Sequence, residues 1–121
     1  MLLNGNYRCV LDGEVQSIRD AVHGDTDASL AIYDWVHNLC VSIGADSTDL
    51  VPFEKYALAA ESYRKPSSAA RALIAGVPNI ERVDCVVHAI ARAHGKQLDT
   101  VDAIVERGDA CLVRNQAQAA A

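Results

Sequence analysis

Aromatic residues are scarce in this sequence, and it contains no glycine-rich phosphate-binding loop. Only 5% of the 121 residues are Phe, Trp or Tyr. The seven glycines never approach the Gly-x-Gly-x-x-Gly spacing that opens a dinucleotide-binding unit. A complete two-domain cofactor enzyme does not fit in this length, so we expect one domain.

Long apolar runs and an excess of basic charge are missing as well. No run approaches the roughly 20 apolar residues of a bilayer-spanning helix, and the first five residues are too short and polar for a signal peptide. The 16 acidic side chains outnumber the 11 basic ones, so nucleic-acid phosphates would meet net repulsion. We therefore expect a cytoplasmic domain that binds neither membranes nor nucleic acid.

Paired cysteines are also missing. The four cysteines stand alone, without a Cys-x-x-Cys pair or a nearby histidine pair. Zinc sites and dense disulfide frameworks need such spacing. We expect no metal site, and reduced, mostly buried thiols at Cys9, Cys40, Cys85 and Cys111.

The apolar residues that are present recur at intervals of three and four, which is typical of helices. The sequence predicts an all-α fold, a compact multi-helix bundle. Residues 1–115 are expected to form a single helical domain and residues 116–121 a frayed tail with nothing to bury. The expected helices cover about 13–22, 27–43, 52–63, 67–75, 80–94 and from about 100 onward.

Capping residues mark several of these helix ends. Asp25 or Thr26 suits the start of the second helix, and Asn79 suits the start of the helix over residues 80–94. Gly95 suits the left-handed position after that helix.

Two hydroxyls and two cations gather at one predicted helix start, within residues 63–68. Unpaired backbone N–H groups and the positive end of the helix dipole favour an anion there, so Arg64, Lys65 and Ser67 form a candidate site for a carboxylate or phosphate. The alternative is that Ser67 or Ser68 caps its own helix while the two cations face solvent.

Histidine and tryptophan give weaker signals. Asp84 and His88 lie four residues apart and share a predicted helix face, a spacing that suits a metal ligand pair or an oriented base but more often marks a surface pair. His94 suits a helix C-terminus, and Trp35 suits packing or an interface. No Ser-His-Asp arrangement is present, so the residues alone leave the function open.

The order of helix boundaries in the second half of the chain resembles a known family. Pro66-Ser67-Ser68 opens a short helix that ends at Ala75-Gly76, and residues 79–84 (Asn-Ile-Glu-Arg-Val-Asp) open a longer helix that closes on residues 92–95 (Arg-Ala-His-Gly). This pattern resembles the C-terminal helical domain of ketopantoate reductase (2-dehydropantoate 2-reductase). That domain is similar to the C-terminal domains of the 6-phosphogluconate dehydrogenase superfamily. The resemblance covers roughly residues 30–105.

Members of that family are two-domain NADPH-dependent enzymes that pass hydride to a 2-keto acid in the cleft between the domains. The resemblance implies that this chain is the substrate-binding and dimerising half of such an oxidoreductase, with NADPH held by a nucleotide-binding domain outside this sequence. It implies a homodimer, a small 2-keto acid as substrate, no cofactor-binding residue in this chain, and no activity without the cofactor domain.

The resemblance also assigns a catalytic asparagine and a substrate-binding serine. The family pairs a lysine with an asparagine four residues later to polarise the keto group. Residues 1–4 resemble the tail of that motif, so Asn4 matches the catalytic asparagine and the lysine falls before this sequence begins. The substrate-binding serine corresponds to Ser67, or to Ser68 after a shift of one residue.

The family glutamate that contacts substrate hydroxyls falls on Asn79 without gaps, and Glu81 takes its place only after a shift. The resemblance therefore favours a 2-keto acid with fewer hydroxyls than ketopantoate. Arg64 is the remaining candidate for substrate binding, through the carboxylate.

A function of a different class stays open. A stand-alone, non-catalytic helical module that oligomerises or binds a partner also accounts for the missing cofactor domain and for Asn79. An exposed apolar patch on such a domain tends to be covered by another copy, so we expect a dimer in either case. A third hypothesis is a small-anion binder that uses Arg64, Lys65 and Ser67.

Overall fold

The computed structural model describes residues 2–121, and this range is all-helical apart from loops and one isolated bridge between Val10 and Val15. The all-α prediction is confirmed. The α-helices are α1 (Leu2–Gly5), α2 (Ile18–His23), α3 (Thr26–Ser42), α4 (Phe53–Ala60), α5 (Ser68–Ile74), α6 (Val83–Ala93) and α7 (Asp99–Ala120), and two 3-10 helices, η1 (Tyr7–Cys9) and η2 (Ser47–Asp49), follow α1 and α3.

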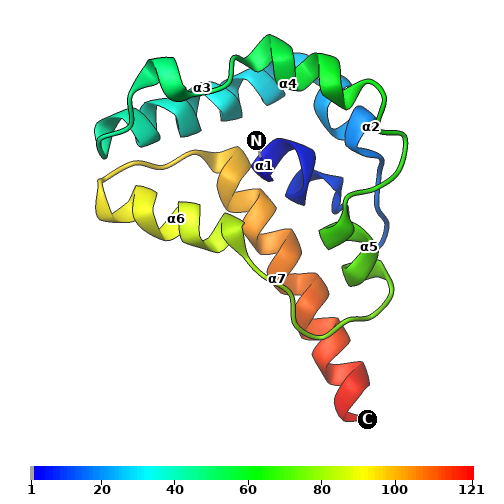
Figure 1. Cartoon of the computed structure of the whole chain (residues 1–121). Coiled ribbons are helices and arrows are strands. Elements are labelled where there is room, and N and C mark those ends of the chain that lie inside the picture. Colours follow the sequence, from blue (N-terminus) through cyan, green and yellow to red (C-terminus); the bar gives the residue numbers. More distant parts are fainter. Residues whose placement is uncertain (1) are drawn as a thin grey trace.

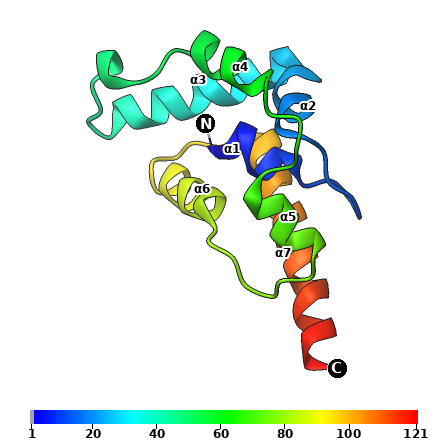
Figure 2. The same ribbon diagram turned by 45° about the vertical axis from the view of Figure 1, so that its right-hand side comes forward.

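The short helix α1 lies at the centre of the molecule. It packs against α2, α3 and α6, with α3 and α6 on opposite sides of it (Figure 1). α6 packs along α7, and α5 packs on α7 and η1. The rotated view in Figure 2 shows the same arrangement, and in both views the C-terminal turns of α7 project beyond the other helices.

Two clusters of buried apolar side chains form the core. The first lies between η1, α2, α5 and the second half of α7, and it includes Leu73, which is 2% exposed. The second lies between α1, η1, α3 and the first half of α7, and it includes Ile32 and Val101. Trp35 packs at the edge of this second cluster, in agreement with a packing role. The segment Leu2–Cys9 therefore contributes to both clusters.

Several predicted helix ends are confirmed by the capping geometry. The Asp25 side chain accepts a hydrogen bond of 3.1 Å from the Ala28 backbone N–H at the start of α3. Gly44 and Gly95 follow α3 and α6 with φ of 113° and 69°, a left-handed backbone that glycine adopts without strain.

The start of α2 differs from the prediction. α2 begins at Ile18 rather than near residue 13, and Ser17 caps it by accepting from the Asp20 N–H at 3.0 Å. Gly13 has a φ of 74° and Val15 pairs with the strand-like residue Val10, so this segment is a turn. The helical spacing of its apolar residues was overridden by the turn-forming glycine.

The prediction that Asn79 caps a helix beginning at Ile80 is wrong. α6 begins at Val83, and the Val83 N–H donates to the hydroxyl of Tyr7 at 3.1 Å. The same hydroxyl donates to the carbonyl of Glu81 at 2.7 Å. A tyrosine distant in sequence thus satisfies the helix start that Asn79 was expected to cap.

The expected frayed tail is helical in the structure, because α7 continues through residues 116–120. Two amide side chains tie this end of α7 to the loop after α5. Asn115 Nδ2 donates to the carbonyls of Leu73 and Val77, at 2.9 Å each, and Gln116 Nε2 donates to the carbonyl of Pro78 at 3.0 Å. Within residues 2–121, no helix is both long and apolar enough to cross a bilayer.

Candidate functional site

Asn4 is buried at the centre of a hydrogen-bond network between α1 and α3. Its Nδ2 donates to the carbonyl of Ser29 at 2.8 Å, and its Oδ1 accepts from the Arg8 guanidinium at 3.1 Å. Arg8 also donates to the Ser29 hydroxyl at 2.8 Å, and that hydroxyl donates to the carbonyl of Val22 at 2.7 Å. Because Asn4 is 1% exposed, its first role is to hold α1 against α3.

Ser67 caps α5, as the alternative interpretation of residues 63–68 predicted. Its hydroxyl accepts from the Ala70 N–H at 3.1 Å and donates to the carbonyl of Asn6 at 2.7 Å. The side chain is buried, so it joins the start of α5 to the segment between α1 and η1.

Ser68 and Arg64 lie beside this cap and are exposed. They line an open depression of about 490 Å³ together with Lys65 and Arg71. Three cations therefore line one surface depression together with several hydroxyl side chains, of which the Ser67 hydroxyl is already bonded within the protein. This grouping is the part of the predicted anion site that the structure brings together.

Asn79 and Glu81 lie in the exposed loop before α6. The contact that the structure gives Glu81 is through its backbone carbonyl, which accepts from Tyr7 Oη. The predicted site residues therefore do not surround one cavity. Asn4 lines a cavity between α3 and α6, whereas Ser67, Ser68 and Arg64 line the depression at α5.

The predicted residues nevertheless meet at one short segment of the chain, Leu2–Cys9. Asn4 belongs to it, Ser67 bonds to the carbonyl of Asn6, and the loop that carries Asn79 and Glu81 bonds to Tyr7. Two stretches from different parts of the sequence are therefore fixed against the segment that contains Asn4. Sequence reasoning had no signal for Tyr7, whose role depends on partners more than 70 residues away.

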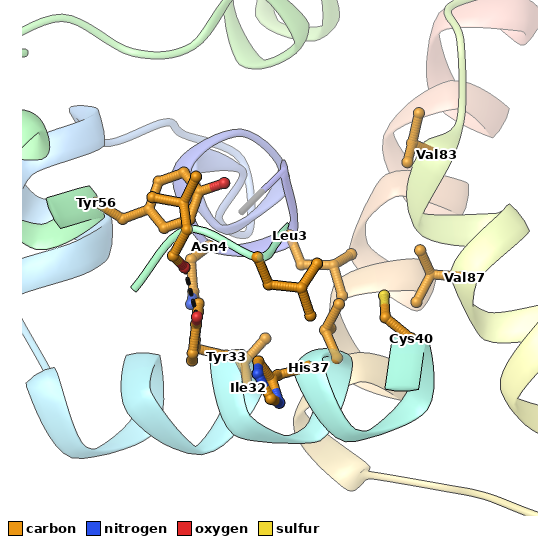
Figure 3. Close-up of a pocket in the computed structure, with 12 residues that line it drawn as sticks. Leu3, Asn4, Ile32, Tyr33, His37, Cys40, Tyr56, Val83 and Val87 are labelled. Carbon is orange, nitrogen blue, oxygen red and sulfur yellow. Dashed lines mark hydrogen bonds between the residues drawn. The ribbon is translucent and has the colours of Figure 1, made fainter. Parts of the chain in front are cut away.

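An apolar cavity of about 240 Å³ lies between α3 and α6, with α1 at its inner end. Figure 3 shows Leu3 of α1 between the side chains of α3 and Val87 of α6. Apart from Asn4, its polar side chains come from α3 and α4, and the loop before α4 contributes two apolar side chains. The lining residues are Leu3, Asn4, Ile32, Tyr33, Val36, His37, Cys40, Leu50, Val51, Tyr56, Val83 and Val87.

Tyr33 organises the aromatic wall of this cavity. Its hydroxyl donates to the carbonyl of Val51, and its ring lies 5.8 Å from His37, 5.6 Å from Phe53 and 6.3 Å from Tyr56. Burial raises the pKa of Tyr33. Since Tyr33 and Asn4 already bond within the protein, the cavity best accommodates apolar groups.

The predicted Asp84–His88 pair does not form. His88 Nε2 instead lies 2.9 Å from Asp102 Oδ1 on α7, and Gln97 Nε2 donates to the other oxygen of Asp102 at 2.7 Å. Asp84 is fully buried and bonds to Arg82. Both side chains lie on α6 as the spacing of four residues predicted, but Asp84 bonds to Arg82, two residues earlier, and His88 bonds to Asp102 on α7.

The cysteines are unpaired in the structure. Cys9 and Cys111 are buried, and Cys40 and Cys85 are partly buried. Burial raises the pKa of both Cys9 and Cys85, which keeps these thiols protonated. Among residues 2–121, no three His, Cys, Asp or Glu side chains are grouped as a metal site.

The residues present do not fit NADPH, the cofactor that the resemblance implies. A dinucleotide site needs a strand, a glycine-rich turn and a helix, and the only extended pairing in residues 2–121 is the bridge between Val10 and Val15.

Comparison with known proteins leaves the family open. No protein-family model, no curated protein sequence and no solved structure matches this chain.

Proposed function

We propose that this chain is the helical, substrate-binding half of an NADPH-dependent oxidoreductase of small 2-keto acids that resembles ketopantoate reductase. One observation carries the proposal. Asn4 belongs to the segment Leu2–Cys9, and the two other stretches with family-like sequence, at Ser67 and at residues 79–84, are hydrogen-bonded to that segment. A cleft enzyme needs its binding residues fixed against one rigid element.

The helix boundaries also support this proposal. Ser67 opens α5, and Gly76 follows α5 with a φ of 91°. Gly95 follows α6 with a left-handed backbone. These are the positions at which the family pattern has a serine helix start, a glycine after the short helix and a histidine-glycine end.

In this proposal the chain binds and orients the keto acid. Arg64 and Lys65 supply positive charge for its carboxylate at the depression beside α5. Asn4 and Ser67 are buried and bonded within the protein, so they hold the supporting elements in place. NADPH and the proton-donating lysine belong to the other half of the enzyme.

The test begins with the purified chain, NADPH and ketopantoate. We expect neither a change in NADPH fluorescence nor NADPH oxidation. We then expect the coding sequence on the 5′ side of the first codon to encode a lysine four residues before Asn4, and that sequence or an adjacent gene to encode a Gly-x-Gly-x-x-Gly segment. Turnover by the chain alone, or the absence of both features, would refute the proposal.

A second function is favoured by a separate observation. Val86 and Val113 are 56% and 65% exposed, on α6 and α7, so apolar side chains are left on the surface of both helices. A stand-alone helical module that forms a homodimer or binds a protein partner would cover them. Sedimentation at high micromolar concentration tests this: a dimer is expected, and a monomer contradicts self-association.

A further inference from the structure

The side of α6 that faces away from the core is apolar. Four exposed apolar residues of this helix recur at spacings of three and four, which places them on one side: Val86, Ala89, Ile90 and Ala93. With about 100° of rotation per residue, this side lies nearly opposite Asp84 and Ala91, the buried residues of α6. We call these four exposed residues the outer face of α6.

An apolar outer face is unusual, because a surface helix normally carries polar or charged residues on the side away from the core. Val86 is 56% exposed and Ile90 is 36% exposed. The main packing partners of α6 among residues 2–121 are α1 and α7, and both leave the outer face uncovered. Figures 1 and 2 show α6 at the edge of the molecule. An exposed apolar stripe of this kind is typical of an interaction surface.

The first end of α6 is acidic. Arg82 bonds to the carboxylates of both Asp84 and Asp109, at 2.9 Å and 2.8 Å. One guanidinium therefore faces two carboxylates. Glu81, which is exposed next to Arg82 in the sequence, adds a third negative charge at this end.

The last end of α6 carries free cations. Arg92 is exposed in its last turn, and Lys96 follows three residues after the helix ends. The carboxylate near Arg92 is that of Asp102, which already accepts hydrogen bonds from His88 and Gln97. A second α6 that runs antiparallel would bring the acidic end of one helix to the basic end of the other, whereas a parallel one would bring like charges together. The helix dipoles favour the same antiparallel direction.

The shape of the outer face is complementary to itself in the same direction. When two copies of α6 pair antiparallel about a two-fold axis between residues 89 and 90, Val86 of each copy lies opposite Ala93 of the other. In the same pairing, Ile90 of each copy lies opposite Ala89 of the other. Each large side chain therefore meets a small one, which is how closely packed layers interdigitate. A parallel pairing would place large against large and small against small.

We propose that the outer face of α6 is the contact between two copies of this chain, paired antiparallel about a two-fold axis. The proposal rests on the self-association put forward above as the second function, and it requires neither keto acid nor NADPH. One short helix from each copy makes a contact at the small end of specific interfaces, so we expect a dissociation constant on the order of micromolar.

The experiment measures the dissociation constant of the dimer by sedimentation equilibrium of the full chain. Val86→Arg places a cation on the outer face, and Val113→Arg is the matched control at a valine of α7 that is 65% exposed. We expect Val86→Arg to raise the dissociation constant by at least about tenfold, because two like charges then face an apolar contact. Val113→Arg should leave it unchanged. Circular dichroism of both variants should match the unmodified chain, since both positions are exposed.

Exchange of charge at the two ends of α6 tests the antiparallel direction. Glu81→Arg and Arg92→Glu should each weaken the dimer by about threefold or more, because each places like charges opposite one another. An equimolar mixture of the two variants should form a heterodimer with the affinity of the unmodified chain, because opposite charges again face each other.

A chain that stays monomeric at high micromolar concentration would overturn both this inference and the self-association on which it rests. A dimer that Val86→Arg leaves intact would keep self-association and overturn the contact through α6. Failure of the mixed variants to recover the affinity would overturn the antiparallel pairing. The assay contains neither NADPH nor keto acid, so each of these outcomes is separate from the test of the proposed reductase function.

Discussion

Arg82 holds the carboxylate of Asp84 by two parallel hydrogen bonds, from Nε to Oδ1 and from Nη2 to Oδ2, each 2.9 Å long. Asp84 is 0% exposed. The guanidinium also donates to Asp109 at 2.8 Å and to the carbonyl of Val105 at 3.2 Å, both on α7. The hydrogen bond to Asp84, foremost, raises the pKa of Arg82. This cluster fixes the start of α6 against the middle of α7.

Replacing Arg82 by alanine leaves a buried carboxylate without its cation. We expect a loss of about 3–5 kcal/mol in the free energy of unfolding, measured by urea denaturation. Arg92→Ala, at an exposed position of the same helix, is the matched control and should cost less than about 0.5 kcal/mol. Equal stability of the two variants would show that the ion pair contributes nothing.

A substitution at Gly108 should destabilise the protein when Arg82 is present and stabilise it when Arg82 is absent. A Cβ atom at this position would lie 2.7 Å from Nη2 of Arg82, whose guanidinium is fixed by its hydrogen bonds. Gly108→Ala should therefore destabilise the protein, although alanine favours a helix by about 1 kcal/mol over glycine. In the Arg82→Ala background the same change should stabilise by about 1 kcal/mol. A double-mutant cycle that shows additivity would contradict this packing.

Asp102 makes the stability of the folded protein depend on pH in the acidic range. The hydrogen bond from Gln97, followed by that from His88, holds the pKa of Asp102 below its ordinary value. Its contribution to stability is therefore complete above about pH 4, the unfolded value, and is lost as the pH falls through the lower folded pKa.

Asp102→Asn should lower the melting temperature at about pH 6 and match the unmodified chain at the acid end of a thermal series. Asp99→Asn is the matched control. Asp99 also accepts a hydrogen bond from Gln97, but it is the exposed first residue of α7. A constant difference between Asp102→Asn and the unmodified chain at every pH would be the contrary result.

Tyr7→Phe tests the hydrogen bonds that connect η1 to the start of α6. Loss of the hydroxyl removes the hydrogen bonds to the Glu81 carbonyl and from the Val83 N–H, so we expect a cost of about 1–3 kcal/mol. Hydrogen exchange at the Val83 amide should accelerate. Tyr63→Phe, at a side chain that is 56% exposed, is the control. Unchanged exchange at Val83 would mean that this bond does not hold α6.

The parts of the fold that depend on local chemistry were predictable from the sequence. Asp25 caps α3 and Gly95 follows α6, because a short acceptor side chain and a left-handed glycine act on their own helix. The sequence left two interpretations of residues 63–68 open, and the structure confirms the one in which Ser67 caps its own helix.

The parts that depend on distant partners were not predictable. The start of α6 depends on Tyr7, and the partner of His88 lies on α7 rather than four residues away. Prediction of the cavity would require knowing that α3 and α6 lie on opposite sides of α1. A single sequence does not show which helices face each other. Asn79 and Glu81 were assigned to substrate by resemblance, and the structure places both on an exposed loop.

The proposed function requires this helical chain to bind small 2-keto acids at the elements around Leu2–Cys9. The most direct measurement is an NMR titration of the ¹⁵N-labelled chain with 2-oxobutyrate and with ketopantoate, with acetate as the control carboxylate. We expect chemical-shift changes at the amides of residues 2–9 and 64–71 with the keto acids, larger for 2-oxobutyrate, and weaker changes with acetate. Shifts that are absent, the same with acetate, or confined to other helices would contradict it.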